Sequence, residues 1–144
     1  MKIPRSQGFT LIEILLVVVI LLILAAIAVP NFAGRGEKAR KDAARVDIEA
    51  TLPAALGLFE LDNGIYPTTD QGLIALLQKP AISPVSENWS GPYLKKKIIP
   101  KDPWGREYKY VSPGIRNTED FDLSSLGPDG VESDDDITNW ADSE

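Results

Sequence analysis

The chain has 144 residues, with 15 basic and 21 acidic side chains and a net charge of −6, so one small domain fits beside an apolar N-terminal run. It contains no cysteine and no histidine, which excludes thiolate and imidazole metal sites as well as Ser-His-Asp and Cys-His catalysis. The acidic balance argues against nucleic acid as a partner, because phosphate binding needs clustered Lys and Arg.

Residues 9–29 form an apolar run in which Glu13 is the single charged side chain. As a helix, these 21 residues would reach roughly 31 Å, the thickness of a hydrocarbon core. One interpretation is a cleaved secretory signal with a small-residue cleavage site after Ala28. The other is a retained membrane helix, which the length of the run and the carboxylate inside it favour.

Apolar residues at spacings of three and four predict that an amphipathic helix continues beyond Pro30. Pro30 and Pro53 should each bend this helix or locally break its hydrogen-bond ladder. The sequence Asp62-Asn63-Gly64 should end the helix, with Gly64 as a left-handed cap.

A capping box follows, because Thr68 is succeeded three residues later by Gln71. It predicts a short helix over residues 69–78, which should end before Pro80. Residues 80–103 are rich in Pro, Gly, Ser and Asn and are therefore predicted to be loop.

Two strands are predicted in the last third of the chain. Residues 102–105, Asp-Pro-Trp-Gly, carry a turn signal. Residues 106–111 and 121–126 are then typical of strands, and the polar stretch between them suggests an antiparallel pair. A third short strand would fit the same pattern.

The sequence LGPDGVESDDDITNW brings five carboxylates within eight residues. They are Asp129, Glu132, Asp134, Asp135 and Asp136. Carboxylates this close repel one another unless a cation neutralises them, and calcium takes six to eight oxygen ligands. The EF-hand pattern is missing. Spacing alone leaves two hypotheses open, a solvated acidic tail and a calcium site, and it favours the tail.

The leader KIPRSQG, followed by FTLIE, resembles the type III signal of the type IV pilin superfamily. The resemblance implies that a prepilin peptidase cuts between Gly8 and Phe9 and methylates the new amino group of Phe9. It also implies that Pro30 is the helix kink and that Glu13 acts in assembly. A carboxylate in the membrane costs roughly 2.5–3.5 kcal/mol. Pairing with the Phe9 amine of a neighbouring subunit would offset that cost and fix the register. The alternative is that Glu13 reaches water at the membrane interface.

The remainder of the chain is similar to the major pseudopilins of type II secretion systems. The segments LDNGIYPTTDQGLIAL, GPYLKKKIIPKDPWGREYKYVSPG and DFDLSSLGPDGVESDDDITNW carry this likeness. It implies an α+β, type IV pilin-like fold, with a long N-terminal helix packed on a small antiparallel sheet and a C-terminal calcium loop. The implied divisions are a leader at residues 1–8, a transmembrane and filament-core helix at 9–30, and a periplasmic domain at 31–144.

The same resemblance favours a structural calcium ion in the acidic loop over a solvated tail. The implied ligands are the side chains of three aspartates and two main-chain carbonyls: Asp129, Asp135, Asp136, Leu126 and Val131. Asp134 is an alternative to Asp135, because the loop length leaves the alignment open by one residue.

The expected function is structural rather than enzymatic. We expect the major subunit of a homopolymeric helical filament, the periplasmic pseudopilus, which supports protein secretion across the outer membrane. The chain would be a single-pass protein of the bacterial inner membrane. Its partners would be the prepilin peptidase, minor pseudopilins and an inner-membrane assembly platform with an ATPase, since the sequence has no P-loop motif.

Two alternative functions remain. One is a type IV pilin used in adhesion, motility or DNA uptake, although such pilins usually carry a C-terminal disulfide. The other is a secreted or membrane-anchored calcium-dependent binding module or a carboxylate-based hydrolase.

Overall fold

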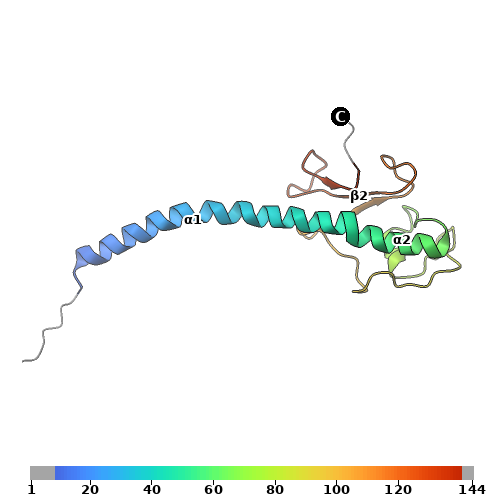
Figure 1. Ribbon diagram of the computed structural model, residues 1–144, viewed down its shortest axis with the longest axis horizontal. Coiled ribbons are helices and arrows are strands. Elements are labelled where there is room, and N and C mark those ends of the chain that lie inside the picture. Colours follow the sequence, from blue (N-terminus) through green and yellow to red (C-terminus); the bar gives the residue numbers. More distant parts are fainter. Residues whose placement is uncertain (1–8, 141–144) are drawn as a thin grey trace, which may run out of the picture. The chain divides into compact units, whose positions relative to one another are not determined.

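The computed structural model describes residues 9–140, without the side chains of residues 26–34. The leader, with the expected cleavage site after Gly8, lies outside the described residues. The elements in chain order are helix α1 (Leu11–Val46), π-helix η1 (Asp47–Thr51), helix α2 (Leu52–Asn63), 3₁₀-helix η2 (Leu73–Leu76), and strands β1 (Lys109–Val111), β2 (Asp122–Ser125) and β3 (Ile137–Thr138) (Figure 1). The chain divides into two compact units, Met1–Lys38 and Ala39–Glu144, which are described separately.

The first unit is built on the N-terminal part of α1. The helix continues through Pro30, so this proline does not end it, and a kink there stays a prediction. The large apolar side chains from Phe9 to Leu24 are all at least 45% exposed. Over the described residues, no helix meets the length and apolarity required to cross a membrane.

In the second unit, the expected break at Pro53 takes the form of a π-helical segment. Pro53 has no N–H to donate to the carbonyl four residues earlier, and η1 ends two residues before this proline. After this segment α2 runs to Asn63. Gly64 caps it with φ 79°, and its N–H donates to the carbonyl of Glu60 at 2.6 Å, as predicted.

The capping box is present, but the helix predicted over residues 69–78 is wrong. The backbone N–H of Thr68 donates to Oε1 of Gln71 at 3.1 Å, and the N–H of Gln71 donates to Oγ1 of Thr68 at 3.3 Å. Gly72 then adopts φ 60° and ψ −177°, which no helix accommodates. The box therefore closes a turn, and only the short η2 follows.

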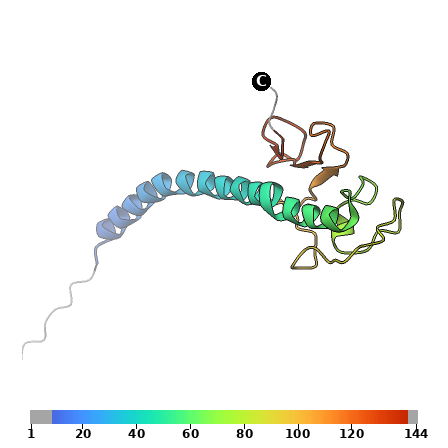
Figure 2. The same ribbon diagram turned by 45° about the vertical axis from the view of Figure 1, so that its right-hand side comes forward.

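The sheet is antiparallel with the order β1-β2-β3, which confirms the predicted pair and the third short strand. Both predicted strands are shorter than expected. Before β1, the backbone N–H of Asp102 donates to the carbonyl of Arg106 at 2.8 Å across the 102–105 turn, and Lys101 forms an isolated bridge with Glu107. Residues 101–107 thus belong to a separate tight turn. Figures 1 and 2 show the strands gathered on one side of α2.

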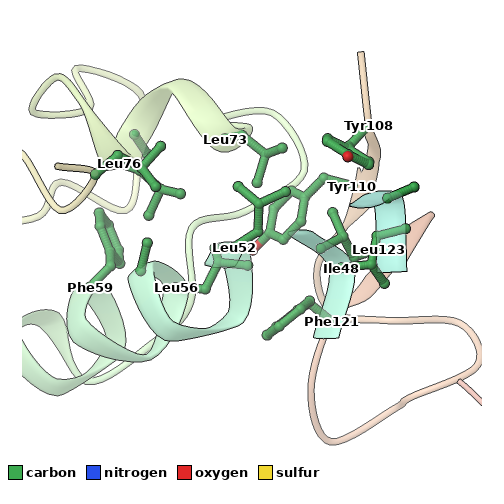
Figure 3. Close-up of a cluster of buried hydrophobic side chains, with 14 of the residues drawn as sticks. Ile48, Leu52, Leu56, Phe59, Leu73, Leu76, Tyr108, Tyr110, Phe121 and Leu123 are labelled. Carbon is green, nitrogen blue, oxygen red and sulfur yellow. The ribbon is translucent and has the colours of Figure 1, made fainter. Parts of the chain in front are cut away.

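The core of the second unit lies between the helical segment, η2 and the sheet. Figure 3 shows that Leu52 and Leu56 of α2 share one apolar cluster with Leu73 and Leu76 of η2 and with Leu123 of β2. All the buried apolar side chains of the described chain, from Ala44 to Ile137, belong to this unit. The second unit therefore has its own hydrophobic core.

Candidate functional site

The start of α1 is capped by Thr10. Its side-chain Oγ1 accepts the backbone N–H of Glu13 at 3.3 Å, and its carbonyl accepts the same N–H at 3.1 Å. Thr-x-x-Glu is the sequence of a capping box, a signal from which the role of Thr10 could have been predicted. The carboxylate of Glu13 also lies in the first turn, where the helix dipole favours negative charge.

Glu13 interrupts an exposed apolar surface. Leu11, Ile14, Leu15, Val18 and Val19 line a groove on this part of α1, and each is at least 45% exposed. A contiguous apolar surface of this kind indicates a contact with lipid or with another protein. The structure thus leaves Glu13 solvent-exposed in the isolated chain, within a surface that suits an apolar partner.

The acidic loop is held together by Ser133 rather than by direct contacts among its carboxylates. The Ser133 hydroxyl donates to Oδ2 of Asp129 at 3.4 Å and lies 2.5 Å from Oδ1 of Asp135. The other oxygen of Asp129 accepts the N–H of Val131 at 3.0 Å. Two of the predicted ligand side chains, Asp129 and Asp135, therefore meet at one hydroxyl.

Two lysines reduce the negative charge around this loop. Nζ of Lys41 lies 4.0 Å from Oδ2 of Asp135, and Nζ of Lys109 lies 3.3 Å from Oε2 of Glu132. Both pairs are partly exposed to solvent, so each contributes at most about 1 kcal/mol.

Asp136 differs from its neighbours because part of its carboxyl is buried without a partner. Its Oδ1 has no hydrogen bond within the protein. Burial raises the pKa of this carboxyl, and the negative charges of Asp135 and Glu132 act in the same direction. An unpartnered buried carboxylate oxygen is costly, so this atom is a donor that suits a bound cation.

The two predicted main-chain ligands take different positions. The carbonyl of Leu126 accepts the N–H of Gly130 at 3.2 Å, while Val131 is 60% exposed. Within residues 9–140, no three His, Cys, Asp or Glu side chains are grouped closely enough to hold a metal. The chemistry of the donor set suits calcium, and the described loop pairs Asp129 with Asp135.

Sequence reasoning missed a second carboxylate site, at Asp122. Its Oδ2 accepts the backbone N–H groups of Ile115 at 2.7 Å and Arg116 at 2.8 Å, and its Oδ1 accepts that of Asn117 at 2.8 Å. Burial alone would raise the pKa of this carboxyl, but the three N–H donors and the charge of Arg116 outweigh burial, so the pKa lies below its ordinary value of 3.8. Asp122 therefore fixes the loop between β1 and β2.

The fold is that of a major pseudopilin. A solved structure described as the major pseudopilin from the type 2 secretion system of enterohaemorrhagic Escherichia coli matches 74% of this chain and 87% of its own, with a TM-score of 0.66 and 39% identity.

Sequence comparison gives the same result. The family described as type II secretion system protein G matches residues 31–140, and the prokaryotic N-terminal methylation motif matches residues 3–29. The type II secretion system core protein G of Pseudomonas aeruginosa is 50% identical, over 94% of this chain and 96% of its own length. That of Klebsiella pneumoniae is 48% identical, over 94% and 95%. The chain belongs to the family of type II secretion system core protein G, which confirms the resemblance predicted from the leader and the C-terminal segments.

Proposed function

We propose that the chain is the repeating subunit of a periplasmic pseudopilus that serves protein secretion across the outer membrane. One observation carries the proposal: the helix of the first unit exposes apolar side chains from Phe9 to Leu24, with Glu13 as the single charged residue among them. Such a surface is unfavourable in water, and copies of the chain related by rotation and rise would bury it repeatedly. A heterologous contact that does not close produces an open fibre.

We propose further that the leader is removed after Gly8 and that the new terminus, Phe9, is methylated. The match of the N-terminal methylation motif to residues 3–29 supports this step. Cleavage creates a positive amino group one residue before the helix cap at Thr10. That amine, on a neighbouring subunit, would pair with Glu13 and fix the axial register, which is the best-attested use of a buried ion pair.

Before assembly, the apolar helix would anchor the subunit in the bacterial inner membrane, with the second unit in the periplasm. The length of the run, residues 9–29, supports this proposal. Extraction from the membrane needs energy, so an assembly platform with an ATPase is a required partner. The prepilin peptidase and minor pseudopilins are the other proposed partners. The role is structural, and the proposal includes no catalytic activity.

We propose that the acidic loop binds one structural calcium ion. Asp129, Asp135, Asp136 and the carbonyls of Leu126 and Val131 would hold it, with Asp134 as the alternative to Asp135. The unpartnered buried oxygen of Asp136 and the pairing of Asp129 with Asp135 support this assignment. When bound, the ion would supply positive charge that offsets the repulsion among these carboxylates.

The test of the fibre proposal is Glu13→Gln, produced in cells that carry the complete secretion system. Glutamine serves as well as glutamate at the third position of a capping box, so the variant removes the charge while the helix start is retained. We expect normal membrane insertion and a loss of fibres seen by electron microscopy of sheared material. Glu119→Gln, at an exposed carboxylate of the second unit, is the matched control and should form fibres normally. Normal fibres from Glu13→Gln would contradict the register role.

A further inference from the structure

Arg106 lies against the first half of the acidic loop. Its Nη2 donates to the carbonyl of Gly127, and a side-chain carbon at Gly130 would come within 2.9 Å of Nη1. The guanidinium carbon also lies 5.9 Å from the ring centroid of Trp104. A planar guanidinium thus occupies the space between the 102–105 turn and residues 127–130.

Asp102 forms an ion pair with this guanidinium. The Asp102 side chain is fully buried, and its Oδ2 lies 3.6 Å from Nε of Arg106, an atom that makes no hydrogen bond within the protein. Oδ1 accepts the backbone N–H of Arg106 at 2.7 Å, while Oδ2 accepts the hydroxyl of Ser125 at 2.8 Å. The Ser125 oxygen in turn accepts the N–H of Gly127 at 3.3 Å. These hydrogen bonds and the ion pair form a network that links the turn, through the end of β2, to the loop.

Gly127 connects this network to a carboxylate of the loop. A side-chain carbon at position 127 would lie 2.9 Å from the carbonyl oxygen of Asp135 and 3.1 Å from its Oδ2. The backbone of Gly127 is therefore packed directly on Asp135, while its own carbonyl is held by Arg106. A shift of Gly127 would displace Asp135.

We propose that Arg106, with Asp102 and Ser125, is a positioning residue that holds residues 126–130 in place without any bound ion and sets the position of Asp135. None of these three side chains belongs to the expected calcium ligands. The loop then has two halves, and the first, residues 126–130, is held by contacts within the protein. This inference goes beyond the proposed function, and only its effect on ion affinity depends on the proposed calcium site.

The test is hydrogen exchange of the full-length chain in detergent micelles, with chelator and with calcium. The probes are two amides: that of Gly127, which donates to Oγ of Ser125, and that of Gly130, which donates to the carbonyl of Leu126 within the same half of the loop. With chelator, we expect these amides to stay protected in the wild-type chain. In Arg106→Lys, which keeps the charge but loses the planar fork, they should exchange about tenfold faster or more. The calcium Kd should weaken by about tenfold, as for other residues that orient metal ligands.

Two controls separate positioning from general stability. Arg116→Lys changes an exposed arginine of the same unit and should leave Gly127 and Gly130 unchanged. The amides of Gly64 and Tyr93, bonded to the carbonyls of Glu60 and Leu76, report on the rest of the unit and should keep their protection in Arg106→Lys.

Three results would overturn the inference. One is unchanged exchange at Gly127 and Gly130 in Arg106→Lys. Another is a uniform increase that includes Gly64 and Tyr93, since Arg106 would then only add global stability. The last is a loss of protection in the wild-type chain when calcium is chelated, because the ion would then hold this half. If calcium binds neither protein, the proposed calcium site fails, while exchange still decides the role of Arg106.

Discussion

Replacing Asp122 by asparagine should strongly destabilise the second unit. The carboxylate is 6% exposed and accepts three backbone N–H groups, at 2.7 to 2.8 Å, from consecutive residues of the loop between β1 and β2. Asparagine keeps one acceptor oxygen and turns an N–H₂ group toward the remaining donor. In the best orientation, Ile115 and Arg116 retain an acceptor and the N–H of Asn117 loses its own.

The magnitude follows from these contacts. A hydrogen bond to a charged group contributes roughly 1.5–3 kcal/mol, and a neutral one about 1 kcal/mol. Losing one charged bond and weakening two others gives a decrease in the free energy of unfolding of about 3 kcal/mol. With an m-value of about 2 kcal/mol/M, the urea midpoint should fall by about 1.5 M. The assay is urea unfolding of the fragment 39–144, which contains all the buried apolar side chains.

The effect should depend on pH in a defined direction. The pKa of Asp122 lies below 3.8 in the folded protein, so its stabilising contribution is complete above about pH 4 and is lost as the pH falls through the folded value. The gap between wild type and Asp122→Asn should therefore be constant near neutral pH and shrink below about pH 4. Asp70→Asn, at an exposed carboxylate, is the control. A loss below about 1 kcal/mol at pH 7, or a gap that widens in acid, would refute the reasoning.

Three further predictions concern the same fragment. Calcium at about one hundred times its Kd should add about 2.7 kcal/mol to the free energy of unfolding, and Asp129→Ala should abolish this gain. An unchanged melting temperature with calcium would contradict the proposed site. With chelator near neutral pH, Asp136→Asn should be at least as stable as wild type, because burial of Asp136 opposes its charge. The variant should also lose the stabilisation by calcium. A marked loss of stability with chelator would contradict this prediction. Tyr108→Phe should cost about 1 kcal/mol in thermal unfolding, since it removes only the 3.0 Å hydrogen bond to Asp47 and keeps the ring; a cost near 4 kcal/mol would mean that the ring packing depends on that bond.

The elements that the sequence predicted correctly are those determined by neighbouring residues. The cap at Gly64, the pairing of Thr68 with Gln71 and the turn at residues 102–105 each depend on residues within four positions of one another. The antiparallel pair was predicted from the turn signal at residues 102–105 and from the polar stretch between the two predicted strands. The helix expected over residues 69–78 failed because the backbone conformation of Gly72 overrides a valid capping signal.

Contacts between distant residues explain what sequence could not predict. Ser125 reaches Asp102 across 23 positions, and Arg106 reaches Gly127 across 21. No local pattern indicates which of many acidic or basic side chains will form such pairs. In the candidate calcium loop, sequence identified the carboxylates, whereas the role of Ser133 in joining two of them required the structure.

The proposed fibre depends most directly on a mature chain that begins at Phe9, and the decisive measurement is its intact mass. The protein would be taken from membranes of cells carrying the complete secretion system and weighed by mass spectrometry. We predict a chain that starts at Phe9 with one added methyl group, which leaves the new amine available to pair with Glu13 of a neighbouring subunit. A chain that starts at Val29 would show an ordinary signal peptide and would contradict the fibre and the role of Glu13 together.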